Sequence, residues 1–317
     1  MLSKKIYNKL KKFYKKKREE LHEPYFSEHE NLEIKKCLKS TFVSTAGNNT
    51  NRFENKIKLI TKSKYSVAVV NATTGIFVSL KALNIKEEEE VLVPSLTFIG
   101  SVNPIAYCNA TPHFIDLNDN FMDIDYERLD NYLSSIVKFK NGKTINKNTN
   151  KVIKAIIPVH LFGHPSNMRR CLSLAKKYKL KIVEDCAEAF GSKFKNKHVG
   201  NFGSIGVISF NGNKIITTGG GGVIITNSKK LFTKINHICC TAKIVKNYRI
   251  YHNKIGYNFK MPSLNASLGL AQLLKLKIFI KKKRMLYNKY VRVLKDEYEY
   301  QIMKEPIDGY SNYWLQT

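Results

Sequence analysis

Apolar runs and helical stretches alternate along the first 240 residues of the chain. The runs are rich in Val and Ile, and each ends at polar or small turn residues before an apolar pattern of helical period begins. They cover residues 67–70, 91–93, 113–117, 155–159, 182–183, 205–210 and 223–226. Continuous rather than alternating apolar runs are typical of parallel strands covered on both faces. The pattern therefore predicts an α/β fold in which helices flank a mostly parallel central sheet.

The two ends of the chain depart from this alternation. Residues 1–20 form a basic leader with nine Lys or Arg and two Glu. Its apolar residues that fall on one helical face are Leu2, Ile6, Leu10 and Phe13. We expect a solvated terminal helix, and a helix that contacts an anionic membrane surface is the alternative. Residues 264–297 carry helical periodicity throughout and predict one long helix.

The net charge of the chain bears on whether it binds nucleic acid or a membrane. The 317 residues include 54 Lys or Arg and 25 Asp or Glu, a formal net charge of +29. Such an excess is typical of proteins that bind nucleic acid or membranes, but here it is nearly all Lys, and no stretch interleaves Arg with aromatic residues. Residues 91–113, the longest uncharged stretch, contain Pro94 and Pro104, which argues against a membrane span. We predict no specific nucleic-acid partner and, without a secretory signal, a cytoplasmic protein.

Cysteines and histidines do not form a metal-binding pattern. The six cysteines show no CxxC pair, which is typical of reduced thiols packed as small apolar residues. His160 and His164 follow the run at 155–159, where ligands bind in open α/β sheets. No carboxylate or Cys accompanies them at metal-ligand spacing. We therefore predict no metal site and treat both histidines as candidates to line a substrate pocket.

The densest candidate chemistry lies in residues 181–222. Asp185 follows a buried run, Ser209 lies near the end of the next run, Lys214 follows a turn, and four consecutive glycines occupy Gly219–Gly222. This combination suits pyridoxal phosphate, which needs an amine to hold it, a carboxylate beside its pyridine nitrogen, and hydroxyl and N–H groups for its phosphate. Spacing alone leaves a solvated lysine and a turn-forming aspartate as the alternative.

A helix start adds a candidate phosphate site. The run at 67–70 leads into Asn71, and Ala72, Thr73 and Thr74 then open an apolar-periodic helix. Free N–H groups and the helix dipole favour phosphate at such a position. An ordinary helix cap is the alternative, since Thr is a common capping residue.

Three segments together resemble a known family. They are Asp185-Cys-Ala-Glu188-Ala, Ser209-Phe-Asn-Gly-Asn-Lys214 and Thr217-Thr218-Gly219. In this order and at these separations they resemble the DegT/DnrJ/StrS family of nucleotide-sugar aminotransferases, which are pyridoxal phosphate enzymes of fold type I. The form from Gly212 to Gly222 is most similar to the subgroup that aminates UDP-linked 4-keto-6-deoxy sugars on routes to bacillosamine and legionaminic acid.

The resemblance implies how the chain is divided. Residues 21–262 would form a large, aspartate-aminotransferase-like cofactor domain. Residues 263–317 would contribute the long helix and the start of an incomplete small C-terminal domain, because in the family more chain follows residues similar to Trp314. We therefore expect apolar residues of the long helix to have fewer packing partners than the family provides and to expose apolar surface; examples are Leu273, Leu276 and Phe279.

The resemblance also implies residue roles. Lys214 would hold the cofactor and move protons between it and the substrate carbon, and Asp185 would keep the pyridine nitrogen protonated. Phe98 would stack on the ring. Glu188 would lie beside the phenolic oxygen, where most of the family has Gln. The other residues expected to contact the cofactor are Ala72, Thr73, Thr74, Ser209 and, from across a dimer interface, Asn258.

The implied activity is pyridoxal phosphate-dependent transamination. An amino group, donated by glutamate in most of the family, would pass to the 4-keto carbon of a nucleotide-linked 6-deoxy sugar for polysaccharide or glycan synthesis. The enzyme would be a homodimer with shared active sites. Lys260 stands where relatives often have Arg and is a further candidate for substrate contact. The alternative is a catalytically weak or silent truncated paralogue that acts as a basic binding protein.

Overall fold

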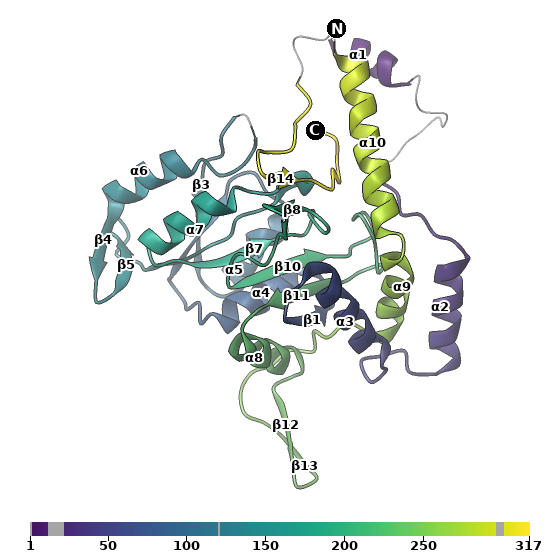
Figure 1. Cartoon of the computed structure of the whole chain (residues 1–317). Helices are drawn as coiled ribbons and strands as arrows, with labels where there is room; N and C mark the ends of the chain where they lie inside the picture. The colour runs from purple at the N-terminus through teal and green to yellow at the C-terminus, as the bar shows by residue number, and fades with distance from the viewer. Residues whose placement is uncertain (1, 12–21, 120, 296–300) are drawn as a thin grey trace.

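Seven strands form the central sheet of the computed structural model, which describes residues 2–11, 22–119, 121–295 and 301–317 (Figure 1). In sheet order they are β1 (Tyr65–Val69), β11 (Gly222–Thr226), β10 (Ile205–Ser209), β7 (Lys181–Asp185), β6 (Ile153–Ile156), β2 (Glu90–Pro94) and β3 (Thr111–Ile115). The pairs from β10 to β3 are all parallel, and β11 is antiparallel to both of its neighbours. The predicted α/β fold with a mostly parallel sheet is confirmed.

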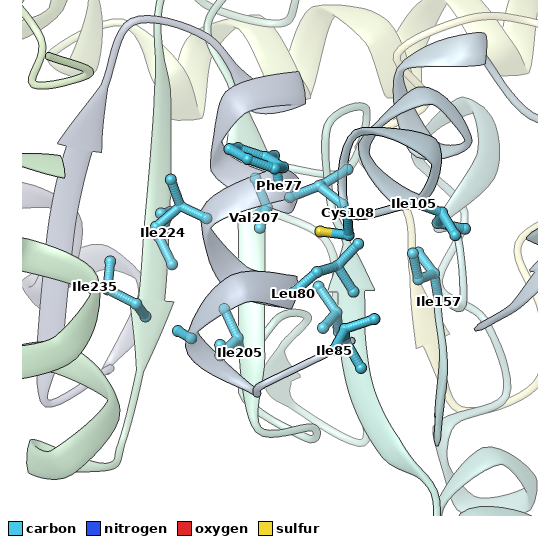
Figure 2. Packing of buried hydrophobic residues seen from close by; sticks show 14 of the residues in the cluster. Phe77, Leu80, Ile85, Ile105, Cys108, Ile157, Ile205, Val207, Ile224 and Ile235 are labelled. Carbon is cyan, nitrogen blue, oxygen red and sulfur yellow. The ribbon is translucent and has the colours of Figure 1, made fainter. Parts of the chain in front are cut away.

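Both faces of this sheet are covered by helices. On one face lie α4 (Ala72–Ala82), α5 (Asn103–Tyr107) and α8 (Lys229–Cys239), and on the other lie α3 (Asn49–Thr61), α6 (Tyr126–Ile136), α7 (Met168–Lys177) and α9 (Ser263–Leu273). Successive strand residues serve opposite faces: Val207 packs under α4 with Phe77 and Leu80 (Figure 2), whereas Ile208 packs with Phe53. Two apolar faces explain why the strands are continuous apolar runs.

The predicted long helix is two helices. The α-helix α9 ends at Leu273, and α10 (Leu276–Leu294) begins three residues later. Glu30, on α2 (Glu28–Lys39), accepts hydrogen bonds from Gln272 Nε2 and Lys275 Nζ on the two sides of the break, both at 2.7 Å or less. The helical period continues across so short a break, so the pattern does not reveal it.

The expected exposure of apolar residues near this break is wrong. Leu273 and Leu276 are buried in the core cluster that contains Phe210, and Phe279 packs against the same cluster. Residues 309–310, beyond the long helix, pack back onto residues 193–198, because β14 (Gly309–Tyr310) pairs with β8 (Lys193–Phe194), which in turn pairs with β9 (Lys197–His198).

Two hairpins extend from the core. The polar residues 137–146 form the hairpin of β4 (Val137–Lys140) and β5 (Lys143–Asn146), in which Thr144 and Asn146 are nevertheless buried. The hairpin β12 (Lys243–Lys246) and β13 (Arg249–His252) projects away from the sheet (Figure 1). Most of the hairpin's side chains are exposed to solvent, so they pack little against the other described residues.

Half of the basic leader is described. Helix α1 (Leu2–Lys11) packs against α10, and residues 12–21, including the predicted apolar position Phe13, lie outside the described residues. Across the described ranges, every helix is too short or too polar to span a membrane.

Candidate active site

The candidate residues meet at the carboxyl ends of three strands. Asp185 is the last residue of β7 and Ser209 the last of β10, and Asn71 lies just beyond β1. The register pairs Asp185 with Val207, which places both strand ends at the same sheet edge. A cavity of about 360 Å³ opens there, and its lining includes Asp185, Ser209, Lys214 and the start of α4. This is where parallel α/β sheets bind ligands.

Asp185 is buried and held in a fixed orientation. One carboxylate oxygen accepts from the Ser101 hydroxyl at 2.6 Å, and the other accepts from the Ala187 N–H at 2.9 Å. Ser101 lies in the short helix η1 (Ile99–Ser101), and its hydroxyl also bonds Thr97 at 2.7 Å. The carboxylate is therefore directed by a preorganised polar shell.

Lys214 lies between a carboxylate and an aromatic ring. Its Nζ is 3.6 Å from Glu188 Oε1 and 3.9 Å from the centroid of the Trp314 ring. The Trp314 ring is itself held, because its Nε1–H donates to the Asn213 carbonyl at 2.7 Å. Glu188 accepts at its second oxygen from the Phe162 N–H at 2.6 Å.

Burial shifts both members of this pair toward their neutral forms. Desolvation lowers the pKa of Lys214, although the nearby Glu188 and Asp185 carboxylates oppose that shift. Desolvation raises the pKa of Glu188, opposed chiefly by Lys214. Since both shifts follow burial rather than attraction between the charges, a neutral amine at Lys214 is easier to reach than at a surface lysine.

The start of α4 forms one end of the cavity. Asn71 caps this helix by accepting from the Thr74 N–H at 2.8 Å. Ala72 and Thr73 line the cavity, and as the first helical residues their N–H groups have no acceptor inside the helix. Phe98 also lines the cavity, and it is 72% exposed, so one face of its ring is open to a ligand.

Two predicted site residues lie away from the cavity in this chain. Asn258 is exposed and forms a single bridge with Cys240. Lys260 Nζ pairs with Glu54 Oε1 at 2.6 Å, and the same Glu54 oxygen accepts from the Ala68 N–H. Glu54 thus anchors Lys260 to β1 rather than leaving it directed at a substrate.

The structure does not bring His160 or His164 to the cavity either. His160 is completely buried: its Nδ1 accepts from the Ser166 N–H at 3.0 Å, so its Nε2 carries the proton and donates to Glu184 at 3.2 Å. His164 is buried edge-on against Tyr313, and burial lowers its pKa to about 4. Both side chains are part of the buried core and do not line this cavity.

His160, Glu184 and Cys186 come within 4.8 Å of one another through their possible ligand atoms. Glu184 nevertheless has a full set of donors. Besides His160, its two oxygens accept the N–H groups of Gly200, Phe202 and Gly203 at 2.6–2.7 Å. A carboxylate has about four acceptor positions, and all are used. The cluster therefore holds the 200–203 turn against β7 and does not offer a free carboxylate to a metal.

Sequence reasoning missed the residues that position the predicted ones. Ser101 orients Asp185, Trp314 covers Lys214, and Asn71 caps α4. Asn71 had a local signal, because Asn before a helical stretch is a common cap. Ser101 and Trp314 had none: each lies more than 80 positions from the residue that it contacts.

The chain is similar in sequence and structure to known sugar aminotransferases. The sequence profile of the DegT/DnrJ/EryC1/StrS aminotransferase family matches residues 24–317. The GDP-perosamine synthase of Escherichia coli O157:H7 is 39% identical over 93% of this chain and 76% of its own length. That of Vibrio cholerae is 31% identical over 94% and 76%. The crystal structure of an aminotransferase from Psychrobacter cryohalolentis has a TM-score of 0.81 at 29% identity, covering 92% of this chain and 75% of its own.

The match extends over nearly the whole chain and includes the segments that carry Asp185, Ser209 and Lys214. The chain belongs to the DegT/DnrJ/EryC1/StrS aminotransferase family, whose members are pyridoxal phosphate-dependent transaminases.

Proposed function

We propose that the cavity at the sheet edge binds pyridoxal phosphate and that this chain is a nucleotide-sugar aminotransferase. The observation that supports this most is that Lys214, Asp185 and the start of α4 line one cavity. An amine, a buried carboxylate and a helix N-terminus are the three groups that the cofactor requires. The donor set therefore fits the cofactor.

When bound, pyridoxal phosphate supplies an electron sink for the amino-group transfer. Asp185, fixed by Ser101, would hold a proton at the pyridine nitrogen. The N–H groups of Ala72 and Thr73, with the Ser209 hydroxyl, would bind the phosphate, and Phe98 would cover one face of the ring. Lys214 Nζ would hold the cofactor and carry protons, for which a lowered pKa is suitable.

We propose that Glu188 contacts the phenolic oxygen of the cofactor. Its pKa is raised by burial, and a protonated carboxyl group can donate to the phenolic oxygen as the amide of Gln would. In its protonated form Glu188 would not repel a phenolate as an ionised carboxylate does.

The proposed acceptor is a nucleotide-linked keto sugar. Two relatives are named GDP-perosamine synthase, so GDP-linked sugars are candidates beside the UDP-linked 4-keto-6-deoxy sugars indicated by the Lys214 motif. We propose amination of the 4-keto carbon of a 6-deoxy sugar with glutamate as amino donor, in the synthesis of a surface polysaccharide or glycan.

Borohydride reduction followed by peptide mass analysis tests the cofactor assignment. We expect the cofactor's added mass on the peptide that contains Lys214. Incubation with glutamate and either GDP- or UDP-linked 4-keto-6-deoxy sugar should then yield an aminated sugar by mass spectrometry. Unmodified Lys214 and unchanged sugars, with salt-sensitive DNA binding instead, would favour the basic binding protein.

We further propose a homodimer. The projecting hairpin exposes Val245 and Ile250, each more than 60% exposed, and Asn258 is exposed nearby in the chain. Exposed apolar side chains of this kind favour association. Asn258 would then contact the cofactor phosphate of the second subunit. Sedimentation velocity should give a dimer, and a monomer under assay conditions would contradict this.

Gly222→Ala should weaken cofactor retention. Gly222 pairs with both Ser209 and Val69, and an added Cβ would lie 2.7 Å from backbone atoms of Asn71 and Ala72. The start of α4 must then move, and we expect at least a tenfold weaker cofactor affinity, with about 1–3 kcal/mol lower stability. Gly220→Ala is the matched control, because its nearest neighbour would be 3.9 Å away. Equal cofactor affinity in the two variants would contradict the phosphate assignment.

A further inference from the structure

A second cavity adjoins Lys214. It has a volume of about 250 Å³ and lies between residues 22–25, the Lys214–Ile215 segment and α10. Lys214 is part of the lining of both this cavity and the larger one at the sheet edge. A molecule in the second cavity would therefore reach the amine that the first cavity holds.

Lysine side chains dominate the charged lining of the second cavity. Lys214, Lys282 and Lys283 line it, against one acid, Glu23. His22 also lines it, and burial together with Lys283 and Lys214 lowers the pKa of His22 to about 4. Among the described residues no carboxylate forms an ion pair with Lys283, and burial lowers its pKa to about 8. His22 Nδ1 is buried and, within the same residues, has no hydrogen-bond partner.

Within the part of the chain that the structure describes, Lys283 has no ion-pair partner and His22 Nδ1 no hydrogen-bond partner. A desolvated ammonium without a counter-ion is unfavourable, which is the physical cause of the lowered pKa of Lys283. An anion in the cavity would supply the missing partner for Lys283 and an acceptor for a donor at His22. The cavity therefore favours binding of an anion. A surface lysine, by contrast, is already solvated by water and gains less from an anion.

We propose, on the basis of the nucleotide-sugar function above, that Lys282 and Lys283 bind the diphosphate of the nucleotide-linked sugar in this second cavity. Both side chains line this one cavity, so their two ammonium groups can together compensate the negative charges of a diphosphate. With the diphosphate there, the sugar extends toward Lys214, where amination takes place.

The apolar walls favour a nucleotide sugar over a free amino-acid donor. Tyr25, Phe279 and Leu286 line the cavity, and Tyr25 is 61% exposed at its mouth. Its volume is below the roughly 300–1,000 Å³ that encloses a drug-sized ligand, so a nucleoside would lie at the mouth. An exposed aromatic ring offers a stacking surface for a base there. A small dicarboxylate would use neither feature.

Calorimetric titration of the full 317-residue chain with GDP, UDP, pyrophosphate and glutamate tests this site. Lys283→Gln should weaken binding of at least one nucleoside diphosphate by about tenfold or more, and it should reduce the salt dependence of that binding. Lys281→Gln removes the same charge from an exposed position on α10 outside the cavity, and we expect less than a twofold effect. Lys282→Gln, at the exposed mouth, repeats the test if Lys283→Gln does not fold.

Each outcome decides for or against the site. Equal weakening in Lys283→Gln and Lys281→Gln would mean a general charge effect and would overturn the proposal, as would a selective loss of glutamate binding. Tight pyrophosphate binding without added affinity from the nucleoside would overturn the role of Tyr25. If the unmodified chain aminates nucleotide sugars but Lys283→Gln binds diphosphates normally, only this proposal fails. If diphosphate binding depends on Lys283 without any amination, the proposed function fails and the site stands.

Discussion

Lys214→Ala should abolish both the covalent retention of the cofactor and turnover. No other described lysine lies in the cavity that Asp185 and Ser209 line, so nothing can take over the role of its amine. A positioned proton-transfer group alone contributes about 10²–10⁴-fold, and loss of the covalent link adds to that. We therefore expect turnover to fall by more than about 10⁴-fold, measured as aminated sugar formed, together with loss of the borohydride-trapped mass.

Lys214→Arg is the informative companion variant. It keeps a positive charge beside Glu188 and under Trp314, but an arginine side chain stays protonated and cannot supply a neutral amine. We expect it to be as inactive as Lys214→Ala while its thermal unfolding remains close to that of the unmodified protein. Turnover above one-tenth of the original rate in either variant would refute the assignment of Lys214.

Glu184→Gln should cause the largest loss of stability among single changes near the site. The carboxylate accepts four hydrogen bonds in a completely buried position. An amide replaces one acceptor oxygen by an NH₂ donor, which then faces N–H groups. Hydrogen bonds to a charged group contribute about 1.5–3 kcal/mol each, so the loss of two predicts a free energy of unfolding lower by about 3 kcal/mol or more.

Urea unfolding measures this effect, with Glu87→Gln as the control because Glu87 is exposed. Glu184 and Asp185 point to opposite faces of β7, so the fraction of Glu184→Gln that folds should still bind cofactor. A change below about 1 kcal/mol would show that the donors to Glu184 find other partners, and would reopen the cluster with His160 and Cys186 as a ligand site.

Local pattern was sufficient to predict the sheet and to place Asp185 and Ser209 at the ends of its strands. Parallel strands covered on both faces must be apolar throughout, and the observed strands lie within two residues of the predicted runs at nearly every end. Because parallel strands end at one edge, Asp185 and Ser209 had to be close neighbours. The proposal that Lys214 is the cofactor lysine came from the order of three motifs and not from spacing alone.

Tertiary structure alone decided which side chains support that site. The supporting contacts join residues that are far apart in sequence or lie at turns. Ser101 donates a hydrogen bond to Asp185, Trp314 covers the Lys214 ammonium, and four donors surround the Glu184 carboxylate, beside which His160 is buried. Such contacts depend on backbone positions fixed by the packed core, and they leave no periodic signal. The break between α9 and α10 involves Glu30, which lies more than 200 positions away in the sequence. The burial of Leu276 likewise depends on a core cluster whose other members, such as Phe210, come from distant parts of the chain. The sequence by itself thus determined the sheet and which candidate side chains lie at its edge, whereas packing determined how these side chains are oriented, how they are shielded and which of them also line the second cavity.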